Sequence, residues 1–125
     1  MLRGEIRVVN LEPVVGSEAD KRRPAVIVSN DDANATAAML GRGVVTIVPI
    51  TSSTERVLPF QVLLPAEMTG LSRDSKAQAE QVRSVAVQRL GRVIGRLPTE
   101  FMALLDAALR RSEEHTSELQ SLGRI

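Results

Sequence analysis

Residues 4–31 read GEIRVVNLEPVVGSEADKRRPAVIVSND and contain two of the β-strands that we expect. The runs at 5–11 and 24–29 are short and rich in Val and Ile, and Gly, Pro, Asp and Asn lie between and after them. Further strands are expected at 43–50, 60–64, 74–78 and 91–96. Short strands at regular intervals, with turn residues between them, predict a small β-barrel or sandwich.

Two segments have helical character. Residues 30–42 (NDDANATAAMLGR) open with helix-capping residues, continue with alanines and end near Gly41, which predicts a single helical turn between two strands. A longer helix is predicted from Pro98, because proline is favoured in a first helical turn. Apolar residues then recur at helical spacing, at Phe101, Leu104, Leu105, Ala108 and Leu109. They predict one apolar stripe that lies on the sheet.

The last residues differ from the rest of the chain. Residues 111–121 read RSEEHTSELQS, which looks like the in-frame translation of a sequencing adapter. We therefore divide the chain into a domain at 1–111 and a non-native tail at 112–125. The tail has no clear core face, so we expect it to be frayed, or helical only as an extension of the preceding helix. The alternative is an ordinary polar helix end.

Composition limits the available chemistry. A chain of 125 residues is enough for one domain with one modest core. It contains no cysteine, which excludes disulfides, zinc–thiolate sites and thiol catalysis, and its single histidine, His115, lies in the tail. Asp and Glu are scattered without a ligand cluster, so we expect no metal cofactor. Any chemistry must therefore use Arg, Lys, Asp, Glu, Ser or Thr.

Hydropathy and charge indicate a compartment and a type of partner. No stretch approaches the roughly 18 apolar residues of a membrane span. The N-terminus MLRGEIRVV also lacks the apolar run of a secretory signal, so we expect a cytoplasmic protein with no membrane partner. The net charge is +1; without residues 112–125, 15 basic and 12 acidic groups remain, which is +3. A mildly basic domain is compatible with a polyanionic partner.

Four segments, in this order and spacing, resemble the MazF/PemK family across residues 3 to about 110. They are GEIRVVNLEPVVGSEADKRRPAVIVSND, VVTIVPITS, PFQVLL and AEQVRSV. The resemblance implies a mainly β fold with a C-terminal helix, an SH3-like barrel of the CcdB/PemK type. It also implies a homodimeric toxin endoribonuclease that cuts single-stranded RNA sequence-selectively and without a metal, leaving a 2′,3′-cyclic phosphate and a 5′-hydroxyl. A cognate antitoxin peptide is expected to bind in the same groove.

Such cleavage requires a base for the 2′-hydroxyl, positive charge for the phosphorane and a proton for the departing 5′-oxygen. Arg23 is our candidate for the positive charge, because its guanidinium grips two phosphate oxygens and Pro24 stiffens the strand entry. The family motif also places its catalytic arginine there. Thr51 follows Val-Pro-Ile at a strand end and, like the matching threonine of the family, is expected to donate a hydrogen bond to the phosphate. Glu18, in the loop before Arg23, is the candidate general base.

Five further side chains are candidates for RNA binding, namely Lys21, Arg22, Ser52, Gln81 and Arg83. An ordinary structural interpretation stands beside this one. Lys21 and Arg22 either position phosphates or only make their loop soluble. Gln81 and Arg83 either read a base edge or hold their own loop.

Two residues depart from the family pattern. Arg7 stands where the family usually has Trp or Tyr, and Asn10 stands where it usually has Asp. An arginine can stack on a base as an aromatic ring does, so RNA binding can survive the first change. The alternatives to a nuclease are a CcdB-like toxin that binds a protein target such as gyrase, and an inactive module that binds RNA or an antitoxin. CcdB-like chains lack the Arg-Pro and Val-Pro-x-Thr pair found here, which favours the nuclease.

Overall fold

The computed structural model describes residues 2–11 and 22–123, with side chains as far as Ser112. Within these residues the strands are β1 (Glu5–Asn10), β2 (Arg22–Ile27), β3 (Val44–Thr51), β4 (Gln61–Leu64), β5 (Ser75–Gln78), β6 (Arg83–Ala86) and β7 (Leu90–Arg96). The helices are α1 (Asp31–Leu40), α2 (Ala66–Thr69) and α3 (Thr99–Gly123), and the short 3₁₀ turns are η1 (Ala79–Gln81) and η2 (Val87–Arg89). The predicted class, mainly β with a C-terminal helix, is confirmed.

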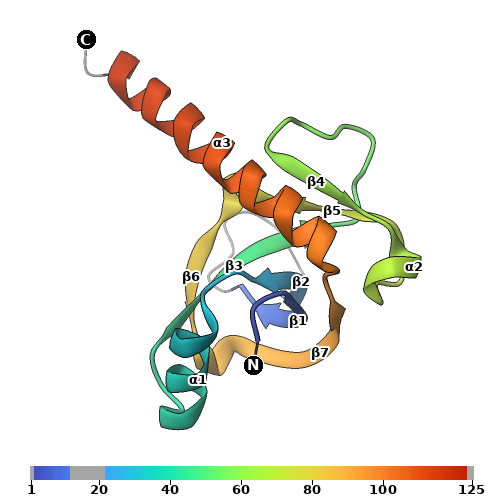
Figure 1. The fold of residues 1–125 in the computed structure, drawn as a ribbon, viewed down its shortest axis with the longest axis vertical. Coiled ribbons are helices and arrows are strands. Elements are labelled where there is room, and N and C mark those ends of the chain that lie inside the picture. The colour runs from blue at the N-terminus through green and yellow to red at the C-terminus, as the bar shows by residue number, and fades with distance from the viewer. Residues whose placement is uncertain (1, 12–21, 124–125) are drawn as a thin grey trace.

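The strands form one strongly curved antiparallel sheet in the order β4-β5-β3-β2-β1-β7 (Figure 1). One edge of β3 pairs with β2, and its other edge pairs first with β6 and then with β5. Ile47 faces Arg83 on β6, and Ile50 faces Ala77 on β5. Pro49 lies between these two ladders, where η1 interrupts the partner strand; proline has no N–H to donate to a ladder.

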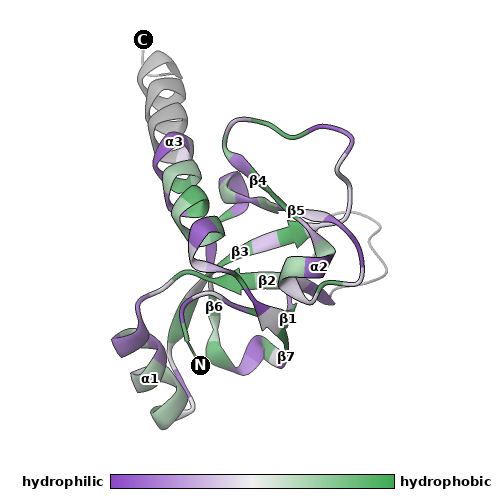
Figure 2. Ribbon diagram, turned by 45° about the vertical axis from the view of Figure 1, so that its right-hand side comes forward, coloured by the Kyte–Doolittle hydropathy of each residue, from purple (hydrophilic) through white to green (hydrophobic). Residues whose placement is uncertain are grey.

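Both faces of the sheet are covered by apolar residues, because successive side chains of a strand point to opposite faces. Val26 belongs to a cluster beneath α3, together with Ile6, Val48 and Leu105. A second cluster lies on the other face and is built from Val9, Ala25, Ile27, Ala37, Val45, Ile47, Val85 and Val87. Figure 2 shows apolar residues concentrated along β2 and β3 and on α3.

Helix α3 packs through a stripe close to the predicted one. Leu105 and Ala108 are buried, and Phe101 and Leu109 pack against the cluster beneath the helix. The prediction for Leu104 was wrong, because its side chain is 54% exposed. Leu104 lies about 100° around the helix from Leu105, which places it outside the buried stripe. The helix begins at Thr99 rather than Pro98, and its backbone continues through the predicted tail to Gly123.

Helix α1 corrects the prediction of a single turn, because it has ten residues. The side chain of Asn30 accepts a hydrogen bond from the backbone N–H of Ala33 at 2.8 Å and caps the helix, and Gly41 ends it with φ of +64°. Asn34 is fully buried and donates to the backbone oxygen of Ser29 at 2.9 Å. This bond joins α1 to the segment between β2 and the helix, and Ala37 packs the helix into the second apolar cluster. The two caps, Asn30 and Gly41, enclose ten residues, so the full segment between them is helical.

Four elements were not predicted from the sequence: α2, the two 3₁₀ turns and β6. Strand β6 has four residues, and of these Val85 is buried while Arg83 and Ser84 are exposed, so its apolar pattern is weak. Strand β2 starts at Arg22, two residues before the predicted start. Within the described ranges, none of the helices combines the length and apolar character that a membrane crossing requires.

Candidate active site

A cleft of about 520 Å³ opens where β2 begins and β3 ends. Three segments distant in sequence form it: residues 22–24, residues 50–52 and the segment 71–75 that leads into β5. Its lining residues are Arg22, Arg23, Pro24, Ile50, Thr51, Ser52, Leu71, Ser72, Arg73 and Ser75. Two of the predicted catalytic residues and two of the predicted RNA-binding residues therefore meet in one cavity.

Strand register explains why Arg23 and Thr51 meet. Ala25 faces Pro49 across the β2–β3 pair. Carrying the same antiparallel register two residues further places Arg23 opposite Thr51, and residues that face each other across a pair project from the same side of the sheet. Both side chains are half-buried and line the cleft, so each is within reach of a ligand bound there.

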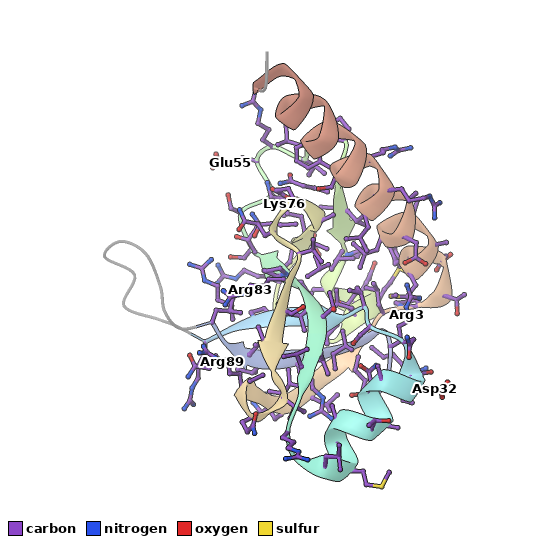
Figure 3. All side chains as sticks on the ribbon, turned by 90° about the vertical axis from the view of Figure 1, so that its left-hand side faces the viewer. Arg3, Asp32, Glu55, Lys76, Arg83 and Arg89 are labelled. Carbon is purple, nitrogen blue, oxygen red and sulfur yellow. The ribbon has the colours of Figure 1, made fainter. Side chains whose placement is uncertain are left out.

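Thr51 is held in an orientation suited to donation. Its hydroxyl oxygen accepts a hydrogen bond from the backbone N–H of Ser53 at 3.3 Å. A hydroxyl carries one proton as well as acceptor lone pairs, so this bond leaves the proton for a ligand oxygen. Lys76 faces Thr51 from β5; it is 8% exposed, and its ammonium donates to the backbone oxygen of Arg56. Lys76 thereby ties the loop that follows Thr51 to the sheet; Figure 3 labels Lys76 and, on this loop, Glu55.

The segment 71–75, which forms the third wall of the cleft, was not predicted from the sequence to be part of the site. Ser72, Arg73 and Ser75 line it, and the hydroxyl of Ser75 donates to the backbone oxygen of Arg73 at 2.9 Å. The neighbouring carboxylate, Asp74, instead accepts from the backbone N–H of Ala66 at 2.9 Å, at the start of α2. The only sequence signal was a Ser-Arg-Asp-Ser run before an expected strand, which is common in solvated turns.

A close backbone approach fixes the position of this wall. A Cβ atom on Gly95 of β7 would lie 1.9 Å from the carbonyl oxygen of Thr69, so only glycine fits there. Gly70 follows with φ of +83°, and the chain turns into the segment 71–75. The close contact at Gly95 therefore sets how near β7 the chain runs just before it enters the segment 71–75.

The electrostatic character of the cleft is uniform. Arg22, Arg23 and Arg73 line it, and none of its described lining residues is Asp or Glu. Guanidinium groups bind phosphate through paired hydrogen bonds, and serine and threonine hydroxyls add further donors. The cleft is thus suited to a phosphate diester. In the described part of the chain, no three His, Asp or Glu side chains gather as a metal site would require.

Two predicted residues lie elsewhere, and two more cannot be placed. Gln81 and Arg83 are exposed on η1 and β6 and do not line this cleft. Arg83 faces Ile47, four residues before Thr51, which is about 13 Å along the strand. Glu18 and Lys21 lie outside the described residues.

Comparison with known proteins shows which family the chain belongs to. Residues 2–112 match the model of the PemK-like, MazF-like toxins of type II toxin-antitoxin systems. The chain belongs to the PemK/MazF family. It is 61% identical over 110 residues to endoribonuclease MazF9 of Mycobacterium tuberculosis, a match that covers 88% of this chain and 93% of MazF9.

Solved structures of the PemK/MazF family share the fold. The toxin MazF-mt6 of Mycobacterium tuberculosis superposes with a TM-score of 0.71 at 25% identity, covering 88% of this chain and 96% of that chain. A mycobacterial endoribonuclease in complex with its cognate antitoxin also has a TM-score of 0.71, at 22% identity, covering 91% and 95%. The second likeness bears on the fold alone.

The departure from the PemK/MazF pattern at Arg7 has a local explanation. Arg7 Nε donates to Glu5 Oε1 at 3.0 Å, and its Nη1 donates to the backbone oxygen of Gly91 at 3.0 Å. Partial burial acts to raise the pKa of Glu5, but the Arg7 hydrogen bond, a bond with the Leu2 backbone and the Arg7 charge outweigh it, so the pKa falls below 4.5. Arg7 therefore links β1 to β7, a structural use of the guanidinium that differs from base stacking.

Proposed function

We propose that the chain is a toxin endoribonuclease that cleaves single-stranded RNA sequence-selectively in the cleft of Arg23 and Thr51. The observation that carries the proposal is the convergence of Arg23, Thr51 and two further arginines in a cavity without a carboxylate among its described lining residues. A scissile phosphate is the ligand that such a lining favours. The 61% identity to endoribonuclease MazF9 points to the same activity.

The proposed reaction is an internal transesterification. The 2′-oxygen forms a bond to phosphorus and the bond from phosphorus to the 5′-oxygen breaks, which yields a 2′,3′-cyclic phosphate and a 5′-hydroxyl. Glu18 accepts the proton of the 2′-hydroxyl, and the 5′-oxygen takes up a proton as it leaves. Arg23 grips the two non-bridging oxygens, and Thr51 donates one hydrogen bond to them.

The reaction is proposed to need no metal ion. Charge builds up on the phosphorane, and a bound cation or a fixed guanidinium can each stabilise it. Arg23 is the second residue of β2 and precedes Pro24. The ring of Pro24 fixes its own φ and restricts the backbone of the residue before it. A guanidinium carried by a restricted backbone needs little reorganisation during the reaction.

The proposed partners follow from the basic cleft and the family. The toxin acts in the cytoplasm as a homodimer, because a small barrel gains stability by burying apolar surface against a copy of itself. An acidic antitoxin segment competes with RNA for the guanidinium groups of the cleft. Residues 112–125 are proposed to be non-native, and the family match ends at residue 112.

Cleavage of a mixed-sequence RNA in EDTA tests the proposal. The wild-type protein is expected to produce cyclic-phosphate ends in the chelator. Arg23→Ala is expected to lower kcat by about 10³-fold and Thr51→Ala by about 10-fold, because each removes a donor to the developing charge. Arg110→Ala, an exposed change on α3 outside the cleft, is the matched control and is expected to retain full activity.

Other outcomes would replace the proposal. Intact RNA that is bound tightly would indicate an inactive binding module. Intact RNA without binding would favour a toxin directed at a protein target. If the RNA is cleaved, sequencing the ends of the cleaved transcripts would define the recognised motif.

A further inference from the structure

A second cleft of about 540 Å³ lies beside the first, at the junction of β1, η2 and β7. Its lining residues are Val8, Asn10, Arg22, Gln88, Arg89, Leu90, Gly91 and Arg92. Arg22 lines both clefts, and it faces Asn10 across the β1–β2 pair. The two cavities are therefore neighbours that share one arginine in their linings.

An irregularity in the β1–β7 ladder shapes the second cleft. Arg7 faces Val93, but two residues later Val9 faces Leu90, so β7 contains one extra residue between these pairs. A bulge of this kind redirects side chains, and bulges are frequent next to active sites. Arg92 lies within the extra stretch and is exposed. The lining of the cleft therefore includes a guanidinium that a regular ladder would place differently.

The backbone beneath this bulge is tightly packed. A Cβ atom on Gly91 would lie 3.0 Å from the backbone oxygen of Val8, which means that β7 passes close to β1 at this point. Arg89 Nη1 donates to the backbone oxygen of Asn10 at 3.4 Å. Figure 3 shows Arg89 on the same side of the molecule as Arg83, away from Arg3 and Asp32. The cleft thus lies where β1 and β7 approach each other closely, next to η2.

The charges of the second cleft repeat those of the first. Arg22, Arg89 and Arg92 line it, and its described lining residues include neither Asp nor Glu. The whole chain is almost neutral at +1, so two adjoining linings that hold five different arginines, and no carboxylate among the residues that the structure describes, mark a local concentration of positive charge. Val8 and Leu90 add apolar surface, against which a sugar or base can pack.

We propose that the second cleft is a phosphate-binding subsite for the same RNA strand, which extends from the cleavage cleft past Arg22 towards Arg92. This inference rests on the proposed function. Successive phosphates of one strand are covalently linked, and a strand that crosses Arg22 keeps its negative charges next to guanidinium groups in both clefts. The subsite supplies affinity for long substrates and no sequence information, because phosphate contacts do not distinguish bases.

Binding of 2′-O-methyl RNA tests the subsite separately from catalysis, because the blocked 2′-oxygen prevents cleavage. Labelled mixed-sequence strands of about four and about twelve nucleotides distinguish one cleft from two. Arg92→Gln is expected to weaken binding of the longer strand about fivefold and to leave the shorter strand unchanged. The slope of log K against log salt is expected to fall by about 0.7, the value for one phosphate contact on a single strand.

Matched variants control for unrelated effects. Arg96→Gln makes the same change on the same strand, exposed but outside both clefts, and is expected to bind like the wild type. Arg92→Lys is expected to recover part of the affinity, because it restores the charge without the planar fork. With a long cleavable RNA, Arg92→Gln is expected to raise KM and leave kcat unchanged.

Three results would overturn the inference. Equal loss with Arg96→Gln would indicate a general charge effect, and a changed sedimentation coefficient for Arg92→Gln would assign the cleft to a contact between subunits. Unchanged binding and KM for Arg92→Gln, in a protein that binds and cleaves RNA, would reject the subsite alone. A wild-type protein that neither binds nor cleaves RNA would reject the subsite together with the proposed function.

Discussion

The two ends of β3 serve different purposes. At the Val44–Ile47 end, the strand pairs with β6 along one edge, and on its other edge Ile47 pairs with β2 and the backbone oxygen of Thr46 accepts from Val28 N–H. Val45 and Ile47 are buried there, while Arg83 on the neighbouring β6 is exposed. At the Thr51 end, the pairing with β2 has ceased and side chains from three segments meet in a basic cleft. A complete ladder commits each side chain to core or solvent, whereas a ladder that ends leaves room for a ligand between its strands.

The largest effect is expected from a substitution that displaces the segment 71–75, which forms one wall of the cleft. Gly95→Ala forces a Cβ atom against the carbonyl oxygen of Thr69, so α2 and the segment 71–75 must move. We expect the free energy of unfolding to fall by about 3 kcal/mol or more, and activity at the Thr51 end to be lost even where the protein stays folded. Urea denaturation and RNA cleavage are the measurements.

Gly41→Ala is the control for Gly95→Ala. Gly41 has φ of +64°, but no other atom lies within 4 Å of the position that a Cβ atom would take, so the change introduces backbone strain without a clash. We expect a cost of about 1 kcal/mol and normal cleavage. Equal destabilisation by both variants would contradict the role assigned to the close contact.

A smaller effect, on kcat, is expected from removing a threonine hydroxyl, and this change can be made at both ends of β3. Thr51→Val removes a hydroxyl from the cleft, and we expect kcat to fall about tenfold because one hydrogen bond to the phosphate is lost. Thr46→Val makes the same change near the other end, where Thr46 faces Ser84, and kcat is expected to stay within about twofold. Similar losses in both variants would mean that the hydroxyls act through the stability of the strand.

Arginine variants compare the same two ends for substrate binding. Arg73→Gln is expected to raise KM about fivefold, because Arg73 lines the cleft. Arg83→Gln is expected to raise KM by about twofold or less, because Arg83 lies beside Ile47. A larger effect of Arg83→Gln would extend the RNA path along β6, in agreement with the interpretation of Arg83 as an RNA-binding residue.

The smallest effect, on stability, is expected for the ion pair of Glu5 and Arg7, which lies on β1 and away from β3. Because the pKa of Glu5 is lowered, its charged form stabilises the fold above about pH 4.5, and this contribution is lost as the pH falls through the pKa of the folded state. Glu5→Gln is expected to weaken this acid dependence, by less than about 1 kcal/mol. Unfolding curves from pH 3 to 7 measure it, and cleavage per folded molecule at neutral pH should not change. A pH dependence identical to the wild type would contradict the role given to the Arg7 hydrogen bond.

The sequence was informative wherever a feature depends on neighbouring residues. Short runs rich in Val, Ile and Leu located four strands, and two more were expected at 74–78 and 91–96, where β5 and β7 lie. The Arg-Pro and Val-Pro-Ile-Thr segments located Arg23 and Thr51. The register that brings these two together depends on the β2–β3 pairing, which the local sequence pattern does not specify. The wall around Arg73 was missed because its position depends on the contact of Gly95 with Thr69, two residues 26 positions apart.

The sharing of Arg22 between two cavities has a consequence for equilibrium measurements. A small anion in one cavity draws on the same positive charge that a ligand in the other requires, so the two occupancies are linked and the linkage is reciprocal. Sulfate or phosphate from a buffer would then compete with a ligand of the first cleft even when the anion occupies only the second cleft. Affinities determined in such buffers would describe a mixture of the two occupancies, and chloride media at matched ionic strength offer the cleaner reference.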